Sequence, residues 1–165
     1  ATALDRIAEE RSSVAGQIAA YAGSDLVCYR ADQPLELTAR QEETWQPLID
    51  WVQQRFDARL IATTGIAAVD QPSDALTRIA DAVHAHDDFT MAALSTLTAL
   101  SGSVVIALAL SEGQLNGEQA FEAAVLDESF QIERWGLDYE AEDRRTSIRN
   151  EILSAERFLI LYRAG

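Results

Sequence analysis

The chain has 165 residues, of which 48% are hydrophobic and 24% are charged, a composition typical of a folded domain and not of a disordered chain. Thirteen basic residues against 27 acidic ones leave a formal net charge of −14. Because so acidic a surface repels phosphate groups, nucleic-acid binding is all but excluded, and binding to anionic membranes is disfavoured for the same reason. The charge favours a basic protein partner, although solubility alone would also account for it.

The residue inventory excludes further chemistry. All 13 basic residues are arginines, so no reaction that needs a lysine amine is available. Cys28 is the single cysteine, so the chain forms no internal disulfide. The sequence contains no glycine-rich phosphate loop and no G-x-S-x-G nucleophile motif.

The first part of the chain predicts two helices and two short strands. Apolar segments flanked by turn residues predict the strands at Asp25–Arg30 and Arg59–Thr64. A helix is predicted between the two strands, and Thr38 and Gln41 form the predicted capping box at its start. The other helix is predicted before the first strand and ends at Gly23. Its hydrophobic residues recur at helical spacing. They are Leu4, Ile7, Val14, Ile18 and Tyr21.

From residue 72 onward the pattern predicts only helices, over about 72–86, 87–102, 104–110, 116–135 and 140–162. The uncharged run Met91–Leu110 has the length of a membrane span, but a Ser-Gly-Ser break divides it and acidic residues flank it. We therefore expect a buried helical hairpin there. Asn116 is the expected cap of the next helix. The predicted fold class is mainly α, with about six or seven helices and two short strands.

Two groups of residues could carry enzyme chemistry. His84 and His86, followed by two aspartates, are of metal-ligand types, but residues two apart on a helix point about 200° apart, so we expect no metal site. Cys28 could act as a nucleophile only if a histidine converged on it in a pocket, and its apolar strand predicts an inert thiol. We expect no catalytic residue and no cofactor. A small cysteine- or histidine-dependent enzyme and a generic interaction scaffold remain the alternatives.

Glu128 lies in the middle of an apolar helix stripe, where an unpaired carboxylate is costly. The hydrophobic residues of that stripe are Phe121, Val125, Ile132 and Trp135. Two explanations stay open. Glu128 either forms an internal ion pair with the last helix or anchors a basic group or backbone donors of a partner. The candidate arginines of the last helix are Arg144, Arg145 and Arg149.

The same segment carries a resemblance to a known family. LDESFQIERWG, over Leu126–Gly136, resembles the hallmark of the assembly chaperone that attends the α subunit of F1-ATPase in mitochondria and related bacteria. CYRADQPLELTARQEETWQPLIDW (Cys28–Trp51), GSVVIALALSEGQLNGEQAFEAAVLDE (Gly102–Glu128) and RFLILYRAG (Arg157–Gly165) are similar to further parts of that family, in the same order. The resemblance covers about Asp25–Gly165.

The resemblance implies an N-terminal β-rich domain followed by a helical domain, so residues 1–165 would form a single helical domain without the β-rich one. It also implies a chaperone that binds the newly made α subunit until this joins the β subunit, with no catalytic activity and no cofactor. Such a chaperone is expected to be monomeric when free and to work in the bacterial cytoplasm or the mitochondrial matrix. The client-binding residues expected from it are Asp127, Glu128, Gln131, Glu133 and Trp135.

Overall fold

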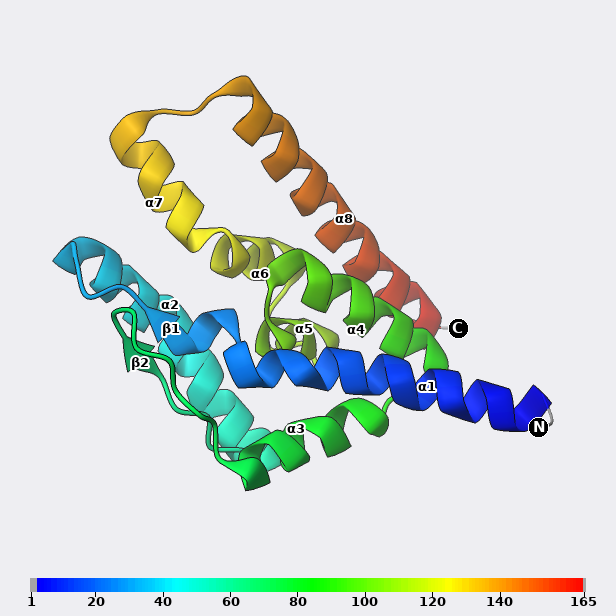
Figure 1. Ribbon diagram of the computed structural model, residues 1–165. Helices are drawn as coiled ribbons and strands as arrows, with labels where there is room; N and C mark the ends of the chain where they lie inside the picture. The colour runs from blue at the N-terminus through cyan, green and yellow to red at the C-terminus, as the bar shows by residue number, and fades with distance from the viewer. Residues whose placement is uncertain (1–2, 165) are drawn as a thin grey trace.

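The computed structural model describes the backbone of residues 3–164 and the side chains of residues 9–164. Over this range the chain forms eight α-helices and two short strands, together with two one-turn 3-10 helices (Figure 1). The predicted fold class, mainly α with two short strands, is confirmed. The α-helices are α1 (Ala3–Ala20), α2 (Leu35–Phe56), α3 (Ser73–His84), α4 (Asp88–Ser101), α5 (Val104–Ser111), α6 (Gly117–Ala124), α7 (Leu126–Trp135) and α8 (Tyr139–Ala164).

The two strands form a small parallel pair beside α2 (Figure 1). The 3-10 turns η1 (Tyr21–Ser24) and η2 (Leu26–Cys28) lead from α1 into β1 (Tyr29–Arg30), which pairs with β2 (Thr63–Thr64). Both strands occupy only the last two residues of the segments predicted as strands. A parallel pair needs a crossover connection, and α2 supplies it.

Helix α2 begins earlier than the sequence predicts. Its first residue is Leu35, after Pro34, and it continues through Pro47 without a break. The predicted capping box at Thr38 is therefore wrong. The Thr38 hydroxyl instead donates to the carbonyl oxygen of Ala31 at 2.7 Å, because a tertiary contact with the end of β1 takes the hydroxyl that the cap would have used.

The uncharged run forms the predicted buried hairpin of α4 and α5. Every residue of α5 is buried, and α2, α4, α6 and α8 pack around it. Gly102, with a φ of 74°, makes the turn between the two helices in the left-handed region that favours glycine. In the range that the structure describes, no helix combines the length and apolar character needed to cross a membrane.

A buried carboxylate fastens the segment after α1 to the start of α5. Asp25 accepts hydrogen bonds from the Ser103 hydroxyl and from the backbone N–H of Val104 at 2.9 Å. The same side chain accepts from the N–H of Val27 at 3.3 Å, so it joins η2 to the central helix. Burial raises the pKa of Asp25 to about 6, although these hydrogen bonds oppose the rise.

The predicted helix over 116–135 is divided into α6 and α7 at Val125. Its start is as expected, because Asn116 caps α6 in a capping box with Gln119. A tertiary contact lies at the break. The indole N–H of buried Trp45 donates to the carbonyl oxygen of Ala123, near the end of α6, at 2.9 Å.

Helix α1 buries only part of its predicted stripe, and α8 buries few of its residues. In α1, Ile18 is buried and Val14 is half-buried, whereas Leu4 and Ile7 lie outside the described side chains. In α8, Ile152 and Leu159 are the two buried residues. Figure 1 shows α7 and the first half of α8 projecting together from the rest of the fold, joined by a short loop.

Candidate functional site

The hairpin of α7 and α8 carries every residue expected to bind a client. Within α7, Leu126 and Phe130 are buried against the body of the protein. The far end of the hairpin is open to solvent instead. Trp135 is 81% exposed, and Tyr139 at the start of α8 is 87% exposed. Because α6 and α7 are separate helices, the stripe predicted to include Trp135 does not form one buried face.

Glu128 forms the main polar contact between α7 and α8. It is in an ion pair with Arg144 and accepts a hydrogen bond from Arg145 at 3.1 Å. Of the explanations left open by the sequence, the internal ion pair is therefore present. Its side chain nevertheless remains 30% exposed, so a partner can still reach the carboxylate.

The two arginines that meet Glu128 are also held by other groups. Arg145 donates to the hydroxyl of Ser129 at 2.9 Å and lies over the ring of Phe121, 5.5 Å from its centroid. It is the more buried of the two, at 18% exposure against 55% for Arg144. Arg149, the third candidate, pairs instead with Glu118 of α6. These contacts fix the angle at which the first half of α8 leaves the fold.

Asp127 faces α2 and is held by a buried glutamine. The side-chain amide of Gln41 donates to the Asp127 carboxylate at 2.7 Å. The carbonyl oxygen of the same amide accepts from the backbone N–H of Ala31 at 2.8 Å. Gln41, which is only 2% exposed, thereby connects the exposed Asp127 of α7 to the residue that follows β1.

Glu133 is the second contact of α7 with α2. It forms an ion pair with Arg40, whose second nitrogen donates to the carboxylate at 3.1 Å. The Arg40 guanidinium holds the pKa of Glu133 below its ordinary value. Arg40 also lies over the ring of Phe130, 5.7 Å from its centroid. Gln131, like Trp135, is exposed.

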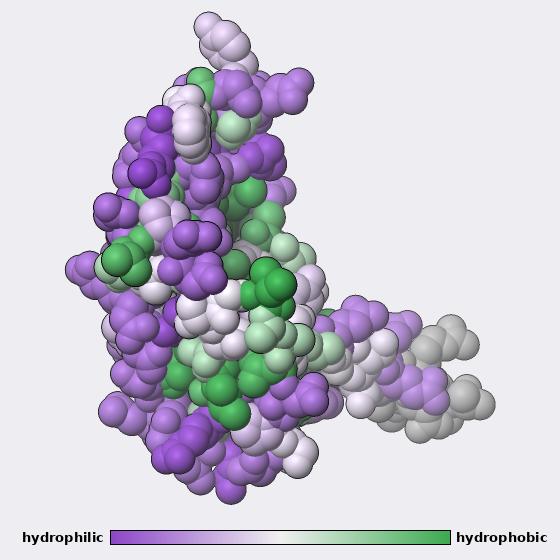
Figure 2. Space-filling model, turned by 60° about the vertical axis from the view of Figure 1, so that its left-hand side comes forward, coloured by the Kyte–Doolittle hydropathy of each residue, from purple (hydrophilic) through white to green (hydrophobic). Residues whose placement is uncertain are grey.

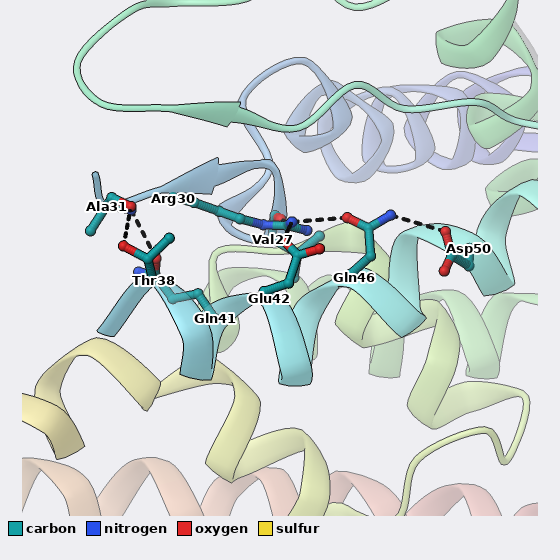
Figure 3. A network of polar contacts seen from close by, with 8 residues as sticks. All are labelled: Val27, Arg30, Ala31, Thr38, Gln41, Glu42, Gln46 and Asp50. Carbon is teal, nitrogen blue, oxygen red and sulfur yellow. Dashed lines mark hydrogen bonds and ion pairs between the residues drawn. The ribbon is translucent and has the colours of Figure 1, made fainter. Parts of the chain in front are cut away.

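Arg30 organises a polar network behind this surface (Figure 3). Its buried guanidinium donates to the Glu42 carboxylate at 2.7 Å and to the Gln46 amide oxygen at 2.8 Å. Gln46 in turn donates to Asp50 at 3.0 Å. Sequence reasoning missed this network, although Thr38, Glu42, Gln46 and Asp50 repeat every four residues and so share one face of α2.

The side of the molecule on which α2 and α7 lie is mainly hydrophilic, with hydrophobic residues gathered in its middle (Figure 2). Among the acidic side chains of α7, those of Asp127 and Glu133 are exposed and that of Glu128 is half-buried. The three carboxylates expected at the site, those of Asp127, Glu128 and Glu133, each contact α2 or α8, whereas Gln131 and Trp135 face solvent.

Cys28 and the two histidines do not form an enzyme site. Cys28 is fully buried, and burial is the main cause that raises the pKa of its thiol to about 12. A thiol that stays protonated in a sealed core is not a nucleophile. The backbone carbonyl groups of His84 and His86 accept hydrogen bonds from Arg11, which pins α1 to the end of α3. Within the described part of the chain, no three metal-ligating side chains come together.

Known proteins share this fold. The family model for the ATP12 chaperone protein matches residues 1–53. The crystal structure of Atp12 from Paracoccus denitrificans is similar to this chain with a TM-score of 0.90 and 37% identity, over 96% of this chain and 68% of that one. A mutant of the Paracoccus protein gives a TM-score of 0.90 at 36% identity, with the same coverage. A chaperone-like protein of Agrobacterium tumefaciens gives 0.85 at 40% identity, over 96% of this chain and 59% of its own.

Proposed function

The chain belongs to the ATP12 chaperone family, and from this premise we propose that it binds the unassembled α subunit of F1-ATPase and shields its interface until the β subunit joins. Its role as a chaperone comes from the family. The identity of the client, monomeric behaviour when free, and action in the bacterial cytoplasm or mitochondrial matrix belong to the proposal. The proposed role is binding without catalysis and without a cofactor.

The observation that carries the proposal is the exposed aromatic end of an acidic hairpin. Trp135 and Tyr139 face solvent at the tip of α7 and α8, and aromatic residues of this kind dominate binding energy at protein interfaces. An unassembled subunit exposes an apolar surface that aggregates unless it is covered. Apolar contacts from the tip would supply affinity, and the surrounding carboxylates would supply steering and selection of a basic client patch.

The proposed client-binding residues are Asp127, Glu128, Gln131, Glu133 and Trp135. The contacts that three of them make inside the protein leave room for a partner. A carboxylate can accept about four hydrogen bonds, so two arginines do not saturate Glu128. A basic group of the client, or its backbone N–H groups, can therefore add to the ion pair without breaking it. Gln131 and Trp135 are available directly because they are exposed.

Separate co-expression with the F1 α and β subunits, followed by pull-down, tests the client. We expect the α subunit to be retained and the β subunit not to be. Trp135→Ala should abolish retention of the α subunit, because it removes the aromatic contact at the tip. Ile66→Ala is the matched control, since Ile66 is a fully exposed apolar residue near β2. Equal retention of both subunits, or no retention of the α subunit, would contradict the proposal.

A further inference from the structure

A second surface lies on α8, beyond the part of that helix that meets α7. A groove of about 510 Å³ runs between α4 and α8. Figure 1 shows α4 beside the second half of α8, on the other side of the fold from the tip of the hairpin. Its lining includes Ala92 and Thr96 from α4 and Ser147, Glu151, Ser154 and Phe158 from α8. None of these residues belongs to the proposed client-binding set.

Phe158, which lines the groove, belongs to a cluster of three exposed aromatic rings. The ring of Phe89 lies 5.0 Å from that of Tyr162 and 6.5 Å from that of Phe158, measured between centroids. Phe158 and Tyr162 stack at 6.2 Å. Phe89 is 57% exposed and Phe158 is 42% exposed. An exposed aromatic cluster beside a groove is typical of a binding surface.

The shape of the groove suits a helix. Its α8 residues Ser147, Glu151, Ser154 and Phe158 are spaced by four, three and four, so they lie along one face. Short side chains on both walls let the axis of a third helix approach closely, and the aromatic cluster offers a place for its largest apolar residue.

The charged residues around the groove indicate which kind of partner helix it would bind. Glu151 is exposed within it. An adjoining groove shares Ala92 and carries Glu10 and Asp88, and its one arginine, Arg11, already contacts Asp88 and two backbone carbonyl groups. A partner residue placed here therefore meets acidic groups, which favours arginine or lysine. A second copy of this chain fits poorly, because each copy carries a net charge of −14.

We propose that the groove between α4 and α8 binds a basic amphipathic helix of a partner protein. An apolar side chain of that helix rests on the ring cluster of Phe89, Phe158 and Tyr162, and an arginine or lysine of the same helix pairs with Glu151. This surface is separate from α7, so it does not depend on the identity of the client proposed above.

Titration with a synthetic helix tests the groove. The probe is a peptide of leucine, alanine and arginine with one apolar face, and its control carries glutamate in place of arginine. We expect the arginine peptide alone to bind and to shift the NMR amide signals of Ala92, Thr96 and Ser154. Failure of the arginine peptide to bind, or shifts confined to other helices, would overturn the proposal.

Two variants separate the groove from the overall charge. Ser154→Trp fills the groove at an exposed position of α8, and Glu151→Arg reverses its charge. Each should weaken binding about tenfold or more. Asp81→Arg, on the exposed side of α3, changes the net charge as Glu151→Arg does and should leave affinity within about twofold. Equal weakening by both reversals would show bulk attraction only. A dimer in sedimentation that Ser154→Trp disrupts would show that a second copy occupies the groove, and both outcomes overturn the proposal.

Discussion

At the scale of single residues, the proposed site depends on carboxylates that already have partners. Asp127, Glu128 and Glu133 hold α7 against its neighbours and are also proposed to meet a client. Removing one of these charges should therefore have different effects on folding and on client binding. An exposed ion pair contributes little to folding, whereas a charge that a client desolvates contributes much to binding.

We expect Glu128→Gln to reduce the unfolding free energy by about 1 kcal/mol or less, because the pair with Arg144 and Arg145 is only partly buried. Binding of the α subunit should weaken by about 2–5 kcal/mol, as when one side of a buried interface pair is lost. Glu128→Lys should abolish binding. Chemical denaturation and pull-down measure the two effects.

Glu118→Gln is the matched control for Glu128→Gln. Glu118 lies on α6 and, like Glu128, forms an ion pair with an arginine of α8, in its case Arg149. The control variant should leave client binding unchanged. A large loss of stability in Glu128→Gln, with client binding by the folded fraction intact, would assign Glu128 to the fold alone.

Because the pKa of Asp25 is raised, we expect the stability of the fold to depend on pH. Its pKa is about 6 in the folded chain against an ordinary value of 3.8, so the folded state holds a proton that the unfolded state has released between these values. Stability from this group is therefore complete below about pH 4 and is lost as the pH rises through about 6, a change of about 3 kcal/mol. Denaturation of wild type and Asp25→Asn at several pH values measures it.

The comparison removes the contribution of the other carboxylates, because both proteins share them. The stability advantage of the wild type over Asp25→Asn should shrink from pH 4 to pH 7. A constant advantage would mean that the hydrogen bonds from Ser103 and Val104 balance the cost of burial, and one that grows with pH would mean that they outweigh it.

At the scale of elements, the sequence predicts the features that depend on a local pattern of residues. The α4–α5 hairpin follows from an uncharged run with a glycine turn, and the start of α6 follows from the Asn116 capping box. The sequence does not predict the features that depend on tertiary contacts, such as the helix end at Val125. No glycine or proline near Val125 signals a helix end, and the contact that lies there comes from an indole on another helix. The hydrogen bond between Gln41 and Asp127 joins residues 86 positions apart, so no spacing rule reveals it.

The contact of α6 with α8 leads to a prediction at Gly117. A Cβ atom there would lie 2.6 Å from a carboxylate oxygen of Glu156 and 2.7 Å from a methyl carbon of Leu153. The Gly117 N–H also donates to Glu156 at 2.6 Å, so the two helices cannot separate without losing it. Both atoms are the ends of flexible side chains and can move, so Gly117→Ala should lower the unfolding free energy by only about 1 kcal/mol in a denaturation experiment, chiefly by displacing Glu156 from the Gly117 N–H.

Gly16 provides the opposite case, because it lies within α1 and a methyl group added there would meet no atom within 4 Å. Gly16→Ala should raise the unfolding free energy by about 0.5–1 kcal/mol, since alanine loses less backbone entropy in a helix. If both variants change stability in the same direction, close approach of α6 to α8 is not what requires glycine at 117.

At the scale of the whole molecule, one cluster of buried hydrophobic residues extends from α1 to α8. A continuous core of this kind is lost all at once, so we propose that residues 1–165 behave as a single helical domain. Thermal unfolding followed by circular dichroism should show one cooperative transition, and the calorimetric and van't Hoff enthalpies should agree. Two resolved transitions would contradict a single domain, because part of the helical fold would then unfold separately.

The net charge of −14 determines how the molecule should meet its client. If the α subunit presents a basic patch to the acidic hairpin, long-range attraction accelerates encounter, and salt screens it over about 10 Å at 0.1 M. The association rate constant should therefore fall as ionic strength rises, while the dissociation rate constant changes less. Stopped-flow or surface-binding measurements at several salt concentrations give both constants. Neutralising Glu133, whose carboxylate reaches solvent beside Arg40, should reduce the salt dependence, and neutralising Asp81 on α3 should not. An association rate that is flat across the salt series would leave the exposed aromatic tip as the whole basis of recognition.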